Sequence, residues 1–347
     1  MRTRTVVAAA CGVCALAGTS YGQTIAPQYA SAYSIANLGS VPGVPGPYGG
    51  VEFLDNDTML IGGGANTAAG AIYSIDVVRD LAGNITGFSG TAALFATAPN
   101  IDGGLQFGQA GVLFYTAYPI NAIGQIKPGS TSPDKIVDLG PLGVTGSTGS
   151  LAFVPPGFPS QGRMKIISYS ANTWYNSALA SDGNGTFNIV DVVLRTTIQG
   201  GPEGAVFITG SNPLFSQPAV LVSEYGGGRV VAYDIDANSD AIPSTRRDFI
   251  TGLSGAEGAT VDPVTGQFMF ATFGGGNQVI AVRGFVPTAC YPNCDGSGTL
   301  DVADFTCFLQ RFASGDSYAN CDNSTTPPVL NVADFTCFLQ QFAAGCQ

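Results

Sequence analysis

Oxygen-bearing side chains recur at a fixed spacing near the end of the chain. The segment "NCDGSGTLDVAD", residues 293–304, carries them at its positions 1, 3, 5, 9 and 12. Gly298 stands at position 6, where a calcium-binding loop turns sharply, and position 7 would offer a backbone carbonyl. Hard oxygen ligands at this spacing suit Ca²⁺ better than zinc. The predicted ligands are Asn293, Asp295, Ser297, Thr299, Asp301 and Asp304.

A second, altered copy of this loop follows in "NCDNSTTPPVLNVAD", residues 320–334. It has three extra residues, includes Pro327 and Pro328, and lacks the turn glycine. Two interpretations stay open: a stiffened, longer loop that still closes on calcium, or a vestigial loop held by disulfides. The candidate ligands of this copy are Asn320, Asp322, Ser324, Asn331 and Asp334.

Each loop leads into a segment that is almost identical in the two copies. "DVADFTCFLQRFASG" (301–315) and "NVADFTCFLQQFAAG" (331–345) share twelve of fifteen residues. Phenylalanine and leucine fall at i, i+3, i+4 and i+7, which predicts one amphipathic helix per copy, ended by a glycine. The predicted apolar stripes are Phe305, Phe308, Leu309 and Phe312, then Phe335, Phe338, Leu339 and Phe342.

Six of the eight cysteines lie in the last 58 residues, and the body of the chain has none. An even, clustered set in an exported chain indicates disulfides, which a module of this size needs for stability. We expect one bond between the flanking pair and two more within or across the repeated units. The six are Cys290, Cys346, Cys294, Cys307, Cys321 and Cys337.

A duplicated EF-hand-type loop with only its outgoing helix, ending in aspartate, resembles a dockerin domain. The resemblance covers about 290–346 and implies Ca²⁺ binding and docking onto a cohesin-like or other envelope protein. In that family, loop positions 10 and 11 are often polar and help choose the partner. Here they are small and apolar, so we expect an envelope or matrix protein rather than a typical cohesin; a disulfide-held helical hairpin without a partner is the alternative. The expected partner-binding residues are Val302, Ala303, Val332 and Ala333.

The body, residues 23–286, repeats one pattern five times. Glycine followed by alternating apolar residues ends at Phe53, Phe107, Phe153, Phe207 and Val261, at spacings of 54, 46, 54 and 54. A period near fifty with several strands per unit predicts an all-β, five-bladed β-propeller. The last unit lacks a strand, and residues 33–43 resemble the fourth strand of the second unit at 134–146. We therefore expect the N-terminal segment to complete the last blade and close the ring; a sandwich or a six-bladed ring is the alternative.

"PEGAVF", "AEGATVDP" and "VAYDIDAN" give the body a loose resemblance to gluconolactonase-like and NHL-type propellers. In the first of these families a glutamate of such an "EG" motif is a metal ligand. The matching candidates here are Glu203 and Glu257, with Asp102 as a possible helper, for cation binding or acid–base catalysis. The simpler interpretation, which we favour, is a strand-entry turn with an exposed acid.

Two other groups of residues have less specific patterns. "DIDANSD" (234–240) alternates acids and amides but fits a polar hairpin better than a calcium loop. Trp174 and Tyr175 could stack on a sugar, although packing in the core is the stronger expectation.

The N-terminal residues, the net charge and the amino-acid composition exclude several classes of function. Arg2 and Arg4 precede an apolar run and small residues, which predicts a signal peptide over 1–22 and a secreted or envelope-associated protein without a membrane span. Removing it leaves 11 basic and 24 acidic residues, a net charge of −13 that disfavours nucleic acid. The chain has no histidine, so any catalysis would rest on carboxylates or tyrosines.

Two functions follow from these patterns. In the first, which we favour, a dockerin-like tail over 287–347 anchors a non-catalytic propeller that binds a ligand or surface. In the second, the propeller is an extracellular hydrolase or lactonase acting on carbohydrate or lactone through carboxylates and a divalent cation.

Overall fold

The computed structural model describes residues 22–286, 291–295, 300–322, 324 and 327–344. Several predictions fall on other residues and therefore lie outside the described part of the chain. They are the signal peptide at 1–21, Ser297, Thr299, Cys290 and Cys346.

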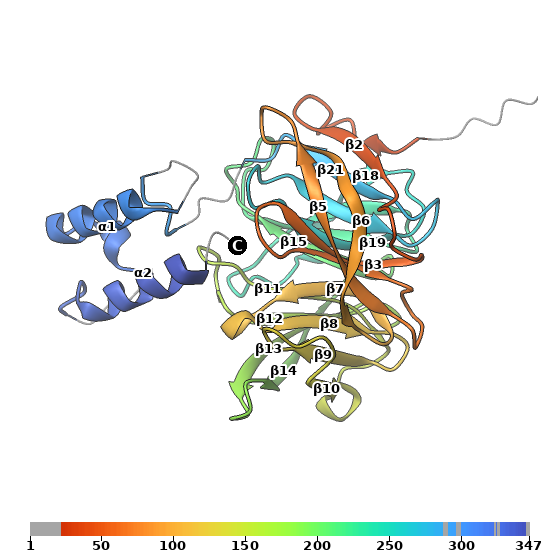
Figure 1. The fold of residues 1–347 in the computed structure, drawn as a ribbon, viewed down its shortest axis with the longest axis horizontal. Coiled ribbons are helices and arrows are strands. Elements are labelled where there is room, and N and C mark those ends of the chain that lie inside the picture. Colours follow the sequence, from red (N-terminus) through yellow and green to blue (C-terminus); the bar gives the residue numbers. More distant parts are fainter. Residues whose placement is uncertain (1–21, 287–290, 296–299, 323, 325–326, 345–347) are drawn as a thin grey trace, which may run out of the picture.

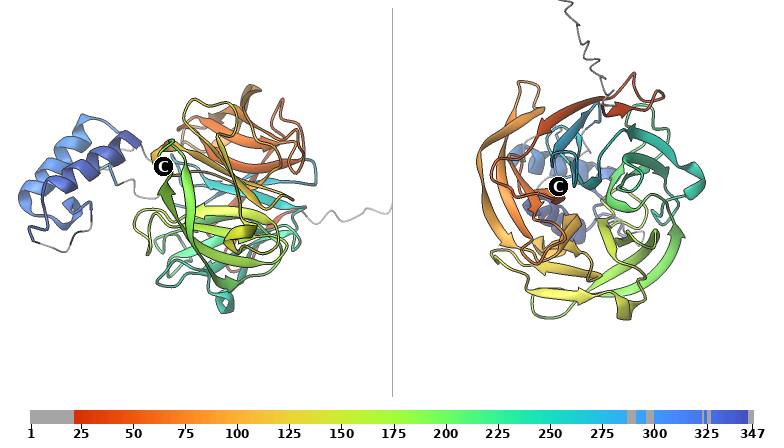
Figure 2. Two further views of the ribbon diagram at one scale, coloured as in Figure 1. Left: turned by 90° about the horizontal axis from the view of Figure 1, so that it is seen from below. Right: turned by 90° about the vertical axis from the view of Figure 1, so that its right-hand side faces the viewer.

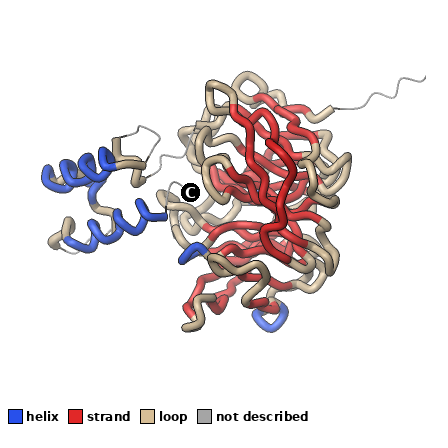
Figure 3. The backbone as a smooth tube through the Cα atoms, viewed as in Figure 1, coloured by secondary structure: helices blue, strands red, loops and turns tan. Residues whose placement is uncertain are grey.

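The described residues form five antiparallel sheets arranged radially around a central axis, followed by two short helices (Figure 1, Figure 2 right). The prediction of a five-bladed propeller with a small helical C-terminal part is confirmed. Figure 3 shows the strands gathered in the ring and the two α-helices grouped apart from it. No helix of the described residues is long and apolar enough to cross a membrane.

Blades one to four are each built from four consecutive strands, with the innermost strand first. Blade one contains β3 (Tyr48–Phe53), β4 (Thr58–Gly63), β5 (Ala71–Arg79) and β6 (Ile85–Thr97). Blade two contains β7 (Ile101–Phe107), β8 (Leu113–Ala117), β9 (Ala122–Ile126) and β10 (Lys135–Asp138). Blade three contains β11 (Thr148–Phe153), β12 (Met164–Ser168), β13 (Thr173–Ser181) and β14 (Phe187–Thr197). Blade four contains β15 (Pro202–Ile208), β16 (Ala219–Glu224), β17 (Arg229–Asp234) and β18 (Arg247–Thr251). Short 3₁₀ turns lie at Gln109–Gly111, Gly140–Leu142, Pro243–Thr245 and Ser317–Ala319.

The N-terminal segment closes the ring, as predicted. Blade five consists of β19 (Ala256–Val261), β20 (Phe268–Thr272), β21 (Val279–Arg283) and then β2 (Ser34–Gly39), which pairs antiparallel with β21. A very short strand that the sequence did not indicate, β1 (Thr24–Ile25), adds to the outer edge of blade four. β2 thereby covers the edge of β21 that blade five would otherwise expose.

Five apolar clusters fill the spaces between neighbouring blades, one for each interface. Because successive side chains of a strand point to opposite faces, one strand serves two interfaces. In β17, Val230 and Ala232 pack toward blade five, while Val231 and Tyr233 pack toward blade three. Burial in these clusters holds the body together, consistent with its lack of cysteine.

The five innermost strands pack backbone against backbone around the axis, and each contacts both neighbours. Glycine permits this approach. A Cβ at Gly103 would lie 1.9 Å from the carbonyl oxygen of Glu203, and one at Gly258 would lie 2.3 Å from the Cα of Gly50. The glycine-led start of every repeat therefore has a steric cause.

The C-terminal part contains α1 (Val302–Ser314) and α2 (Val332–Ala344), packed through their phenylalanines. Phe308 stacks on Phe338 with ring centroids 4.1 Å apart, and Phe305 meets Phe335 edge-on at 5.4 Å. The predicted stripes are correct for the phenylalanines. Leu309 and Leu339, however, are 43% and 40% exposed, because they lie at the edge of the contact rather than in it.

Candidate metal centres

Three acids from three different blades converge at one end of the central channel. Each is the second residue of an innermost strand: Asp102 in β7, Glu203 in β15 and Glu257 in β19. In the two other blades this position is Gly49 or Gly149, and the carboxyl group of Glu203 lies over Gly149, where a Cβ would be 2.5 Å from its Oε2. We refer to the three acids as the channel triad.

The irregular start of β7 explains how Asp102 joins the two glutamates. When the second and fourth repeats are aligned on Phe107 and Phe207, Glu203 is matched by Gly103 and not by Asp102. From Ile101 to Leu105, however, β7 advances by four residues while its partner strand β8 advances by only two. In the corresponding part of blade five, β19 advances by three residues while β20 advances by two. This additional bulged residue shifts Asp102 into the position that the glutamates occupy in their blades.

The triad is compact, buried and poorly satisfied. One carboxylate oxygen from each residue lies within 4.8 Å of the others. Asp102, Glu203 and Glu257 are only 1%, 4% and 1% exposed. Both oxygens of Asp102 and Oε2 of each glutamate are buried without a hydrogen bond of normal geometry. Our expectation that the two glutamates would be exposed turn residues is therefore wrong, and Asp102, the candidate helper, lies with them.

Burial dominates the electrostatics of this site. It raises the pKa of Glu203 and of Glu257 well above the usual range, and the charge of Asp102 raises both further. Burial also raises the pKa of Asp102, while the amide side chain of Asn66 lowers it, so that Asn66 lies against this carboxyl group. Three negative charges here need protons or a cation to offset them.

An aromatic collar surrounds the mouth of the channel above the triad. It consists of Tyr118, Tyr169, Tyr225 and Phe273, each the first residue after the second strand of blades two to five. Consecutive rings meet edge to face with centroids 5.9, 5.9 and 5.7 Å apart.

Backbone hydrogen bonds hold the collar beside the triad. The N–H of Tyr225 donates to the carbonyl of Gly201, and that of Phe273 donates to the carbonyl of Gly255, in each case two residues before a triad glutamate. Burial and then the negative charge of the nearest glutamate raise the pKa of Tyr169 and of Tyr225. In blade one, Gly64 follows the second strand, so this blade adds no ring to the collar.

The other propeller candidates have structural roles. Trp174 and Tyr175 are 0% and 3% exposed, so they are core residues, as expected. Segment 234–240 is a polar hairpin: Asp236 accepts the backbone N–H of Asn238 and of Asp240. Asp240 in turn accepts the buried ammonium of Lys165 at 2.7 Å and joins blades three and four.

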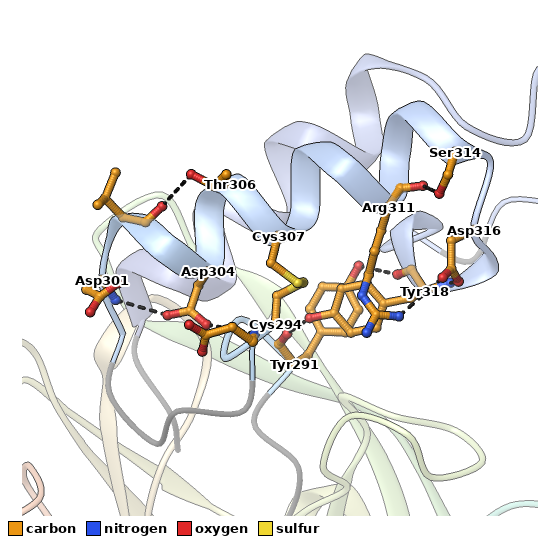
Figure 4. The surroundings of a disulfide bond; sticks show 12 residues. Tyr291, Cys294, Asp301, Asp304, Thr306, Cys307, Arg311, Ser314, Asp316 and Tyr318 are labelled. Atoms are coloured by element: carbon orange, nitrogen blue, oxygen red, sulfur yellow. Dashed lines mark hydrogen bonds and ion pairs between the residues drawn. A yellow bond between two sulfur atoms is a disulfide. The ribbon is translucent and has the colours of Figure 1, made fainter.

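The first predicted calcium loop closes on Asp304 (Figure 4). This residue is fully buried, and its two carboxylate oxygens accept the N–H of Asp295 at 3.2 Å and of Asp301 at 3.0 Å. Asp301 also caps α1 by accepting the N–H of Ala303 at 2.7 Å. Oδ1 of Asn293, at loop position 1, is buried and has no hydrogen-bond partner.

The second loop repeats these contacts despite its insertion. Asp334 is fully buried and accepts the N–H of Asp322 at 3.3 Å and of Asn331 at 2.8 Å. Oδ1 of Asn331 accepts the N–H of Ala333 at 2.8 Å, and Oδ1 of Asn320 is buried and unpartnered, like that of Asn293. The described residues that close the second loop therefore make the same contacts as those that close the first.

One disulfide ties each loop to the helix that follows it. Cys294 bonds to Cys307 and Cys321 bonds to Cys337, so these four cysteines pair within the repeated units. The predicted bond between Cys290 and Cys346 lies outside the described residues.

A pair of tyrosines that sequence reasoning missed joins the two halves. Tyr291 and Tyr318 each stand three residues before a loop cysteine, and their rings stack at 4.7 Å. The hydroxyl of Tyr291 donates to the carbonyl of Tyr318 at 2.7 Å, and the hydroxyl of Tyr318 donates back to the carbonyl of Tyr291. The repeated "Y-x-N-C-D" was the signal available in the sequence, and it shows that the duplication begins before the loops.

The predicted partner-binding residues lie at the surface in both halves. Val302 and Val332 are 78% and 77% exposed, and Ala303 and Ala333 are exposed beside them.

Comparison with known proteins leaves the chain without a family. No family model matches it, and no curated protein matches it. Solved structures with a similar fold include a putative oxidoreductase (glucose dehydrogenase) of Thermus thermophilus, with 13% identity and a TM-score of 0.42 over 72% of this chain and 100% of that one. The PQQ domain of pyranose dehydrogenase from Coprinopsis cinerea has 10% identity and a TM-score of 0.42 over 76% of this chain and 97% of that one. Likenesses at this level assign no activity to the chain.

Proposed function

We propose that this is a secreted calcium-binding protein whose dockerin-like tail, 287–347, anchors a ligand- or surface-binding propeller to an extracellular or envelope partner. The observation that carries the proposal is the duplicated geometry of the two loops. Each ends in a buried aspartate that closes the loop, and each leaves a buried, unpartnered asparagine oxygen at position 1. An unpaired buried carbonyl oxygen is costly unless a cation or another donor satisfies it.

Ca²⁺ would supply what both loops lack. In the first loop, Asn293, Asp295, Asp301 and Asp304 would hold the ion together with Ser297 and the carbonyl of Thr299. In the second, Asn320, Asp322, Ser324, Asn331 and Asp334 would do the same. A buried carboxylate that accepts one N–H per oxygen keeps lone pairs for a metal, so the observed hydrogen bonds are compatible with ligation.

Calcium stoichiometry of the full chain tests the first half of the proposal. By native mass spectrometry, Asn293→Ala and Asn320→Ala should each remove one bound Ca²⁺ relative to the wild type, and the double variant should remove two. Asn184→Ala, which changes an exposed propeller turn, serves as the control and should remove none. Unchanged calcium content in the double variant would contradict calcium binding by the tail.

Docking requires an exposed apolar face. The tail has two such faces, one in each copy of its repeat. Val302 with Ala303, and Val332 with Ala333, begin the two helices next to the calcium loops. We expect a purified envelope partner to bind the full chain in calcium and to dissociate in chelator. Val302→Asp combined with Val332→Asp should abolish binding while calcium content stays unchanged; binding as strong as that of the wild type would refute docking through this face.

A second candidate function is hydrolysis of a carbohydrate or lactone at the channel mouth, and the convergence of the triad is the observation that favours it. A carboxyl group kept neutral by burial can donate a proton, while an ionised neighbour can accept one from water. Purified protein should then hydrolyse members of a lactone and glycoside panel, and Glu203→Gln should lower kcat at least about 100-fold. No turnover across the panel would remove this candidate and leave the binding function.

A further inference from the structure

The channel triad differs from three other buried acids of the propeller in having no cationic partner. Glu224 pairs with Arg246 at 2.6 Å, Asp240 with Lys165 at 2.7 Å and Asp262 with Arg79 at 2.8 Å. Among the residues that the structure describes, none of the three triad acids forms an ion pair with lysine or arginine. The fold thus gives each of these three buried carboxylates a cation, and gives Glu52 hydrogen-bond donors instead, whereas the triad has no cation.

The unpaired oxygen atoms give a second, independent indication of a missing ligand. Four triad oxygens are buried without a hydrogen-bond partner, two of them on Asp102 alone. Oδ1 of Asn66, whose side chain lies against Asp102, is also buried and unpartnered. Oxygen atoms that outnumber the donors around them are the arrangement that a hard cation satisfies and a hydrogen-bond network does not.

We infer that Asp102, Glu203 and Glu257 bind one hard divalent cation, Ca²⁺ or Mg²⁺, at the mouth of the channel. The three carboxylates come from blades two, four and five, and the Asn66 amide of blade one supplies a further oxygen. No cysteine lies in the propeller and the chain has no histidine, so softer metals lack their usual ligands. This inference concerns ion binding alone and stands whether or not the propeller is catalytic.

The aromatic collar defines how a ligand of this cation would approach. The rings of Tyr169 and Tyr225 lie close enough to the triad to feel the charges of its glutamates. The collar places aromatic rings beside the triad, so an oxygen-bearing ligand of the ion would pack against them. Blade one, where Gly64 follows the second strand, contributes no ring at this position.

Terbium luminescence tests the site, because Tb³⁺ replaces hard divalent cations and emits when a nearby tyrosine is excited. The full chain carrying Asn293→Ala and Asn320→Ala, which silences the tail loops, is the background. One equivalent of Tb³⁺ should give saturable, tyrosine-sensitised emission, and competition with Ca²⁺ and with Mg²⁺ identifies the preferred ion. In this background, Glu257→Gln should weaken Tb³⁺ binding at least tenfold.

Two further variants separate binding from folding. Glu52→Gln changes another glutamate of an innermost strand and should leave Tb³⁺ affinity unchanged. Tyr225→Phe should lower the emission but not move the binding midpoint. Without metal, Glu257→Gln should melt no lower than the background, since it removes an unpaired buried acid. Equal emission in the background and in Glu257→Gln, or none in either, would overturn the inference; because the tail is silenced and no turnover is measured, neither proposed function affects this result.

Discussion

At the residue scale, Glu52 joins three blades through one carboxyl group. Its Oε1 accepts the N–H of Phe53 at 2.7 Å and the hydroxyl of Thr260 at 2.9 Å, and the N–H of Phe107 also stabilises its charged form. Burial nevertheless raises the pKa of Glu52 to about 7 from a usual value of 4.5. The cost of burying the charge therefore exceeds what these donors return.

A raised pKa makes the native state bind this proton more tightly than the unfolded chain does. The contribution of Glu52 to stability is thus full below pH 4.5 and is lost as the pH rises toward 7. Glu52→Gln keeps the group neutral. The free energy of unfolding of this variant, relative to that of the wild type, should therefore rise by about 3 kcal/mol between pH 4.5 and pH 8. Urea unfolding at both pH values measures this; Asp191→Asn, an exposed acid, should show no such gain, and parallel profiles for Glu52→Gln would contradict the assignment.

The triad was only partly predictable from residue types and their spacing in the sequence. Glu203 and Glu257 were recognisable because they occupy the same position of two repeats. Their burial and the register that brings Asp102 beside them were not predictable. That register depends on a bulge in β7 that no residue type indicates. The collar was missed for a related reason: Tyr118, Tyr169, Tyr225 and Phe273 follow the second strands at unequal distances from the aligned glycines.

At the element scale, the innermost strands depend on the absence of side chains at their closest contacts. A Cβ at Gly103 would meet the carbonyl of Glu203 at 1.9 Å, and that carbonyl belongs to a strand that cannot retreat without opening blade four. Gly103→Ala should therefore destabilise the protein by about 3 kcal/mol or more. Gly87→Ala in β6, where nothing lies within 4 Å, is the matched control and should change stability by less than about 0.5 kcal/mol. Similar melting temperatures for the two variants would show that the channel is not close-packed.

The tail elements were largely predictable, because helix periodicity and loop spacing are local properties. The two helices, the Asp301 and Gly315 ends of α1 and the residues that close the loops follow from residues 293–315 and their repeat. The stacked tyrosines Tyr291 and Tyr318 were not predicted, since a contact between two halves depends on how they pack and not on either half alone. The exposure of Leu309 has the same origin, because only the packing angle of α1 on α2 decides which side of the stripe is covered.

At the scale of the whole molecule, the blade count and the closure of the ring followed from the repeat period and from the resemblance of 33–43 to a fourth strand. Antiparallel pairing then determines the polarity of the whole. The triad lies where β19 begins, so β21, two strands later, ends at the opposite face. The chain therefore leaves the propeller for the tail on the face opposite to the triad and the collar.

Ring closure by the N-terminal segment leads to a prediction about cooperativity. β2 supplies the outer strand of blade five, and the preceding Tyr29 and Tyr33 are buried against Phe249 between blades four and five. Deleting residues 24–39 should expose the edge of β21 and open this interface, giving a chain that loses cooperative urea unfolding and self-associates in sedimentation. A synthetic peptide of residues 23–40 should bind the deleted chain and restore a single transition, whereas a scrambled peptide should not, because its residues cannot reproduce the pairing of Ile35 with Val282. A deleted chain that stays monomeric and unfolds like the intact protein would show that blade five is stable without its closing strand.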